Sequence, residues 1–263
     1  MSLKRRDLYT GKFSKCLLVS LLCLIPAAAT AQILGFDFSV PAQVSTTGEA
    51  PLKWYSDRYA PCTFSAASTV LIEAVCPTDF QTPTPSFYNT QGNKFDLLAG
   101  TNSISIDLYV PATWELLNER LAGFWATAVN SSYVVGNDYP IMEFQGPIVS
   151  EVPGPSYYPN GGVAGFYGWN NVTNEFAYIG LPTGFRYNSW VKLTMALSGG
   201  QITYTVANSA GGDSVSINSP LYDTTESYLG NVILEAYNYD TPFSIKWKLL
   251  KFSFTSNGQI VWN

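Results

Sequence analysis

The strict alternation of apolar and polar residues in two segments restricts the fold of this chain more than any other sequence feature. In the segment Thr101–Val110, apolar side chains take every second position, at Ile104, Ile106, Leu108 and Val110. Residues 190–197 repeat the pattern with Val191, Leu193, Met195 and Leu197. A period of two places successive side chains on opposite faces of an extended strand. Both segments therefore predict strands that bury one face.

Further strands follow along the chain, separated by glycine, proline and asparagine turns. Residues 202–206 continue the alternation beyond Gly199-Gly200, which predicts a hairpin. Residues 231–239 and 243–254 predict two more strands, and only residues 111–120 favour a short helix or helical turn. We therefore predict an all-β fold, a single two-sheet antiparallel β-sandwich or jelly roll.

The first 31 residues differ from the rest in composition. Five lysines and arginines precede an apolar run from Cys16 to Ala28, which closes on the small residues Ala29 and Ala31. This order is typical of a cleaved secretory signal peptide. We expect residues 32–263 to form one domain that is secreted to an extracellular or periplasmic location. No later segment reaches the roughly 18 consecutive apolar residues that suggest a membrane span, so we expect none.

Charge and cysteine content narrow the partners. Five of the 14 Lys and Arg residues and one of the 19 Asp and Glu residues lie in the first 31, so 9 basic and 18 acidic residues remain. An acidic chain is poorly suited to phosphate backbones, so we expect no nucleic acid partner. The same negative net charge argues, more weakly, against polyanionic glycans as partners. The two cysteines that remain after the leader predict a Cys62–Cys76 disulfide, with two free thiols as the alternative.

Five segments resemble a group of secreted bacterial proteins. They are WYSDRYAP (54–61), FYNTQGNKFDL (87–97), SIDLYVPATW (105–114), GLPTGFRYNSW (180–190) and NVILEAYNYD (231–240). Those proteins have a concanavalin A-like, laminin-G-like sandwich, and most have no assigned activity. The resemblance covers nearly all of the chain after the leader and implies the same sandwich here. It implies no particular function, because this fold hosts lectins, glycosidases and lyases alike.

The absence of histidine excludes several chemistries. A chain with no histidine cannot form a Ser-His-Asp or Cys-His arrangement, or the His/Tyr pair of some polysaccharide lyases. Two cysteines alone also provide too few ligands for structural zinc. We expect no cofactor. A structural Ca²⁺ would have to use Asn137-Asp138 or Asp213, and isolated acidic residues in turns are usually turn formers.

Paired carboxylates are the one catalytic arrangement that the composition permits. Glu143 lies in PIMEFQG, where alternation places it on one face with Gln145, and Glu235 lies mid-strand in NVILEAYNY. The arrangement is similar to that of the small jelly-roll xylanases, whose two catalytic glutamates come from central strands of the concave sheet. Glu143 and Glu235 are therefore the predicted catalytic pair of a glycosidase. The alternatives are that each glutamate faces solvent or pairs with a lysine or arginine, or that both bind sugar without catalysis.

Aromatic residues provide the second functional signal, with 17 Tyr and 7 Trp in the chain. Flat aromatic rings stack on sugars. The predicted ligand-binding residues, besides the two glutamates, are Gln145, Trp125, Tyr167, Trp169, Tyr237 and Tyr239. Core packing is the alternative for at least half of the aromatics, and we assign Trp190 and Trp247 to packing.

The favoured function is a secreted, non-catalytic carbohydrate-binding or cell-surface-associated protein that recognises a poly- or oligosaccharide on its concave sheet. One alternative is a glycoside hydrolase that uses Glu143 and Glu235. The other is a structural or adhesive extracellular protein.

Overall fold

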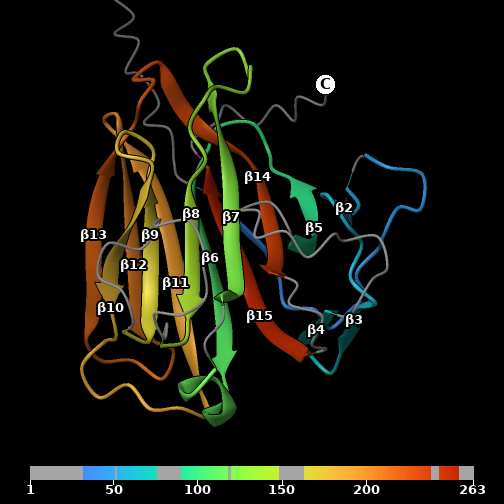
Figure 1. The fold of residues 1–263 in the computed structure, drawn as a ribbon. Coiled ribbons are helices and arrows are strands. Elements are labelled where there is room, and N and C mark those ends of the chain that lie inside the picture. Colours follow the sequence, from blue (N-terminus) through green and yellow to red (C-terminus); the bar gives the residue numbers. More distant parts are fainter. Residues whose placement is uncertain are drawn as a thin grey trace, which may run out of the picture.

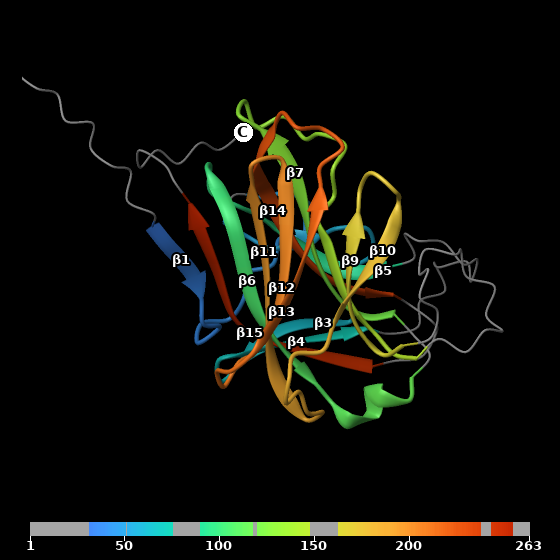
Figure 2. The ribbon, with the colours of Figure 1, turned by 90° about the vertical axis from the view of Figure 1, so that its left-hand side faces the viewer.

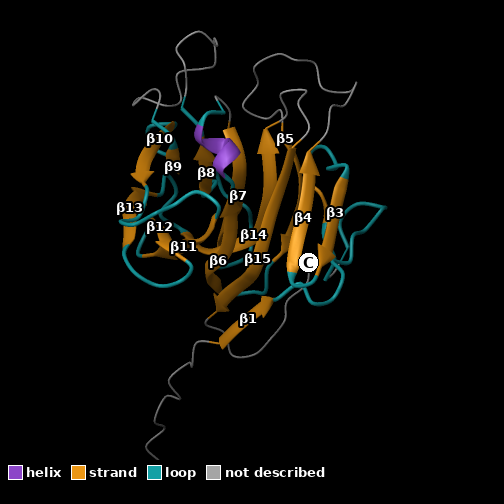
Figure 3. Cartoon of the chain, turned by 90° about the horizontal axis from the view of Figure 1, so that it is seen from below, coloured by secondary structure: helices purple, strands orange, loops and turns teal. Residues whose placement is uncertain are grey.

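Two antiparallel sheets pack face to face in the computed structural model, which describes residues 32–50, 52–75, 90–117, 120–147, 163–237 and 243–254. Figure 1 shows the sheets one behind the other, with β13 and β10 at the left edge and β3 and β2 at the right. Figure 2 looks at the β13 and β10 edge, so the sheets are seen as two layers. The predicted all-β sandwich is confirmed. The described residues contain a single short helical segment (Figure 3).

The strand order within each sheet fixes which residues become neighbours. The eight-stranded sheet contains, in spatial order, β13 (Ser214–Pro220), β12 (Gln201–Asn208), β11 (Ser189–Ser198), β6 (Thr101–Val110), β15 (Phe243–Phe254), β4 (Val70–Val75) and β3 (Thr63–Ala67), and β1 (Gln32–Phe36) pairs with β15. The seven-stranded sheet contains β10 (Glu175–Gly180), β9 (Gly165–Asn170), β8 (Ile141–Gln145), β7 (Arg120–Asn130), β14 (Glu226–Tyr237), β5 (Thr90–Asp96) and β2 (Tyr55–Ser56).

The main core lies between the two sheets, where the alternating segments place it. The four apolar residues of β6 and those of β11 are buried, together with Phe124 and Phe144 from the other sheet. β11 and β12 form the predicted hairpin across Gly199 and Gly200, whose φ angles of 58° and 75° lie in the left-handed region that glycine tolerates. These strand predictions are confirmed.

The predicted helix at residues 111–120 is shorter than expected. Only Ala112–Glu115 forms a 3₁₀ turn (η1), and Arg120 already belongs to β7. Trp114 anchors the turn in the core, whereas Leu116 is 84% exposed. A segment that buries one side chain has no apolar stripe to continue a helix.

The assignment of two tryptophans to packing is half right. Trp247 is fully buried in the core. Trp190 is only half-buried, because it has the parity of Lys192 and Thr194 in the alternating strand and therefore points outward. There it contacts Tyr109 edge to face, with ring centroids 5.4 Å apart. The prediction for Trp190 is wrong, because its position in the alternating strand puts it on the outward face.

A carboxyl group lies inside the core. Glu73 on β4 is fully buried, and the indole Nε1 of Trp247 donates a hydrogen bond to its Oε2 over 2.9 Å. Its Oε1 has no hydrogen-bond partner among the described residues. Burial raises the pKa of Glu73 from 4.5 to about 8, although the Trp247 hydrogen bond opposes this rise. The neutral acid is therefore the form that the fold favours.

We expect Glu73→Gln to make the free energy of unfolding less dependent on pH. The folded pKa is raised, so the contribution of Glu73 to stability is fully present below pH 4.5 and is lost as the pH rises through 8. Glutamine resembles the neutral acid, so the variant should exceed the wild type by roughly 5 kcal/mol at pH 9 and match it at pH 4. Urea unfolding at both pH values measures this, with the exposed Glu175→Gln as control. Equal pH dependence of Glu73→Gln and wild type would contradict it.

Candidate functional site

A single row of residues, which we call the glutamate row, crosses the outer face of the seven-stranded sheet. In order from β5 to β10, it contains Gly92, Glu235, Gly123, Glu143, Tyr167 and Tyr178. Both predicted glutamates therefore lie on one face of one sheet, on the two strands that flank β7. Two strand spacings separate their Cα atoms, which is about 10 Å.

Two glycines give the glutamates their room. A Cβ on Gly123 would lie 2.6 Å from Nε1 of Trp125, and a Cβ on Gly92 would overlap the carbonyl oxygen of Leu234 and Cβ of Glu235. Neither position has space for a side chain. The absence of side chains at Gly123 lets the indole of Trp125 fold over β7, between the two glutamates.

Trp125 ties Glu143 to the sheet. Its indole Nε1 donates a hydrogen bond to Oε1 of Glu143 over 3.1 Å. Both side chains are buried, with 2% and 3% of their residue surface exposed. Trp125 thus acts first as a donor to Glu143, and its ring is not open for stacking.

Glu235 has a different environment from Glu143. It is fully buried, and the Thr90 hydroxyl donates a hydrogen bond to its Oε2 over 3.0 Å. Nη1 of Arg58 lies 3.6 Å from its Oε1. Burial and the Asp57 carboxylate raise the pKa of Glu235 to about 8, in spite of Arg58 and Thr90, which lower it.

Arg58 connects the two glutamates, and sequence reasoning missed it. Its guanidinium carbon lies 5.6 Å from the Trp125 ring centroid, and its Nη1 forms an ion pair with Oδ2 of Asp57 at 2.7 Å. Asp57 also lies 3.4 Å from Nζ of Lys94. The available signal was the scarcity of basic residues after residue 31. For Glu235, the geometry shows the alternative in which the glutamate pairs with an arginine.

The remaining predicted residues are divided. Gln145 is buried on the same face, and its Oε1 has no hydrogen-bond partner among the described residues. The Tyr167 hydroxyl donates to the carbonyl of Val163 over 2.7 Å, and Trp169 packs on Phe176. The structure describes the backbone of Tyr237 as the last residue of β14 but not its side chain. Tyr239 lies outside the described residues.

The aromatic residues of this face form a second apolar cluster. Its buried members are Trp125, Ile141, Tyr167, Trp169, Phe176 and Ile233, with Tyr178 packed against them. The predicted ligand-binding aromatics are therefore largely buried here and do not line an open groove.

The arrangement restricts what the carboxylates can do. A glycosidase needs space between its acid and its base or nucleophile for the glycosidic bond. Here the Trp125 indole lies over Gly123 between the two glutamates, and Arg58 lies on that indole. The face as it stands favours hydrogen bonding by individual acceptors over attack on a bond held between them.

The predicted metal and disulfide residues also have defined places. Asp138 is fully buried and accepts hydrogen bonds from the amides of Tyr222 and Asp223, so it ties two loops together, while Asp213 is exposed. The described residues contain no group of three potential metal-ligating side chains. The Cys62 amide donates to the carbonyl of Ala74 over 2.9 Å. Cys76 lies outside the described residues, so the Cys62–Cys76 pairing stays a prediction.

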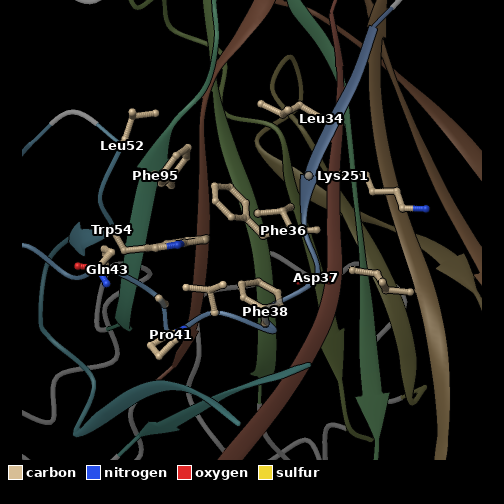
Figure 4. A pocket seen from close by; sticks show the side chains of 15 residues that line it. Leu34, Phe36, Asp37, Phe38, Pro41, Gln43, Leu52, Trp54, Phe95 and Lys251 are labelled. Carbon is tan, nitrogen blue, oxygen red and sulfur yellow. The ribbon is translucent and has the colours of Figure 1, made fainter. Parts of the chain in front are cut away.

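An apolar cavity of about 590 Å³ lies between β1, β5 and β15. Figure 4 shows four aromatic rings around it, those of Phe36, Phe38, Trp54 and Phe95. No sequence pattern singled it out, because its walls come from segments that only the tertiary fold brings together. Within the described ranges, no helix has the length and apolar character that crossing a membrane demands.

Comparisons with known proteins find similarity in structure only. No protein-family model matches the chain, and no curated protein matches its sequence. The CBM2 module of Lactobacillus casei BL23 phage J-1 evolved Dit is similar with a TM-score of 0.49 and 10% identity, over 87% of this chain and 98% of that one. Lectin II from Ulex europaeus gives a TM-score of 0.48 and 13% identity, over 85% and 97%.

A mutant of the GH43 protein BlXynB from Bacillus licheniformis gives a TM-score of 0.49 and 10% identity, over 84% of this chain and 39% of that one. Sequence identities this low carry no function from one chain to another. The functional argument therefore rests on the residues of this chain, and its secreted and bacterial character remain predictions.

We expect Trp125→Phe to lower the free energy of unfolding by about 1–2 kcal/mol, because it keeps the ring and removes one donor to the buried Glu143. Trp190→Phe is the matched control, since that ring is half-buried on the other sheet. Urea unfolding at pH 7 measures both variants. An equal effect of the two substitutions would show that the indole donor adds nothing.

Proposed function

We propose that the chain is a non-catalytic carbohydrate-binding protein whose binding face is the outer face of the seven-stranded sheet. The observation that carries this proposal is a pair of buried side-chain oxygens without a hydrogen bond. Oε1 of Glu235, which lies 3.6 Å from Nη1 of Arg58, and Oε1 of Gln145 have no hydrogen-bond partner among the described residues. Such acceptors cost free energy in the free protein, and sugar hydroxyls supply donors of the required kind.

Access to Glu235 depends on Arg58. The Arg58 side chain is 32% exposed, whereas that of Glu235 is 1% exposed. A hydroxyl group that reaches Oε1 of Glu235 must take the place that Arg58 borders at 3.6 Å. The released guanidinium keeps its closer partner, Asp57, at 2.7 Å. Arg58 is thus the side chain that a bound sugar displaces.

Tyr178, at the β10 end of the glutamate row, supplies an aromatic ring. Tyr178 is half-buried and packs on Tyr167 with ring centroids 5.1 Å apart. Its exposed part lies at the β10 edge, where a sugar ring can stack on it. A ligand that spans the row would contact Tyr178 at one end and Arg58 at the other.

Different features of this face favour the two alternative functions, a glycoside hydrolase and a structural or adhesive protein. The shared row of Glu143 and Glu235 favours a glycoside hydrolase, and the Trp125 indole between them opposes it. A structural or adhesive protein is favoured by the burial of the face as a whole.

We expect Glu235→Gln to retain glycan binding at pH 6 and Glu235→Ala to lose it. Glu235 is protonated well below its pKa of about 8, and glutamine resembles that neutral form. In titrations against a glycan selected from an array, Glu235→Gln should bind within about twofold of the wild type, and Glu235→Ala about tenfold more weakly. The exposed Glu175→Gln serves as control.

Chromatography of the same mixtures separates the alternatives. Released oligosaccharides that disappear in Glu143→Gln would replace the proposal with the hydrolase. If no neutral or acidic glycan of the array binds, the structural or adhesive role is the alternative that remains.

A further inference from the structure

The outer face of the eight-stranded sheet carries a cluster of lysines in an acidic chain. Lys246, Lys248 and Lys251 lie on β15, and Lys192 lies on β11. They make up four of the 9 basic residues that follow the leader. Asp107 on β6 is the one acidic side chain among the described strand residues of this face. We call these five residues the lysine face.

Strand register gathers the lysine face into neighbouring rows. Asp107 pairs with Lys192 on one side and with Lys248 on the other. Lys246 pairs with Tyr109 in the next row, and Lys251 pairs with Ser105 in the row beyond. Adjacent strands lie about 4.8 Å apart, so all four ammonium groups can act on one bound molecule.

Two aromatic rings hold two of the lysines in place. Nζ of Lys248 lies 4.3 Å from the Trp190 ring centroid, and Nζ of Lys246 lies 5.4 Å from that of Tyr109. The rings in turn contact each other. A cation–π contact restricts a flexible lysine before a ligand arrives, so less entropy is lost on binding.

Asp107 offers the acceptor that a purely cationic surface lacks. It is 2% exposed, and its Oδ1 has no hydrogen-bond partner among the described residues. Its Oδ2 is 3.9 Å from Nζ of Lys248, which is a distant ion pair. Burial raises the pKa of Asp107, while the nearby Ser209 hydroxyl and the charges of Lys192, Lys248 and Lys251 lower it. A hydroxyl group on a ligand would satisfy Oδ1.

Small hydroxyl side chains extend the same face beyond the lysines. One row runs from Ser216 through Thr205 and Thr194 to Ser105, each at least partly exposed. These groups hydrogen-bond to hydroxyl and anionic oxygens alike. The lysine face therefore combines cations, one acceptor and a hydroxyl row on a single sheet surface.

We infer that the lysine face binds an acidic polysaccharide, whose carboxylate or sulfate groups contact the lysines and whose hydroxyl groups contact Asp107 and the hydroxyl row. This site is separate from the glutamate row, because it lies on the other sheet. It also reverses the expectation from net charge, since an acidic chain can concentrate its cations locally.

The test titrates the protein with polygalacturonate, which carries carboxylates, and with heparin, which carries sulfates, at about 0.05 M salt. We expect Lys246→Gln/Lys248→Gln to weaken binding about tenfold or more. A second pair, Lys192→Gln/Lys251→Gln, should do the same, and because both side chains are exposed, this pair separates loss of binding from misfolding. The control Lys53→Gln/Arg186→Gln removes equal charge elsewhere and should stay within about twofold.

Three outcomes would overturn the inference. One is that neither polymer binds at low salt. Another is that the control pair weakens binding as much as the lysine pairs, which would make net charge the cause. The third is tighter binding to phosphatidylserine vesicles than to both polymers, which would assign the face to a lipid surface. Glu235→Ala should leave binding of the acidic polymers unchanged, so failure of this inference is distinguishable from failure at the glutamate row.

Discussion

Burial of both faces of the seven-stranded sheet is the constraint on which the rest of the structure depends. Its inner face packs into the main core, and its outer face carries a second apolar cluster around Trp125. A polar group on a doubly buried sheet must find a partner within the protein. The contacts from Glu143 through Trp125 and Arg58 to Glu235 and Thr90 are how this chain meets that demand.

The two outer faces consequently have opposite characters. On the seven-stranded sheet, Glu143, Gln145 and Glu235 are buried, and two of them accept hydrogen bonds from Trp125 and Thr90. On the eight-stranded sheet, lysines and hydroxyls face solvent, and the aromatic rings of Trp190 and Tyr109 support them from the side. The same period-two alternation produces both results, because it decides which side chains point outward but not what covers them.

Parity explains how much could be predicted from the sequence. Alternation placed the cores of β6 and β11, the hairpin, and the shared face of Glu143 and Gln145. The same parity would have placed Trp190 on the outer face had it been followed there. Arg58 was beyond reach, because it approaches Glu235 only through the pairing of β2 with β5 and of β5 with β14. The burial of the candidate face likewise depends on packing that no local pattern encodes.

The position of β15 has a consequence for how the chain folds. This last described strand pairs with β6 along one side, and with β4 and β1 along the other. Until residues 243–254 are synthesised, β6 lacks one neighbour and β1 lacks its partner. Such non-local pairing slows folding and delays the closed sandwich until residues 243–254 are available. A chain that ends before β15 would expose the open edges of β6 and β4, and those edges are the ones at which other chains can add a strand.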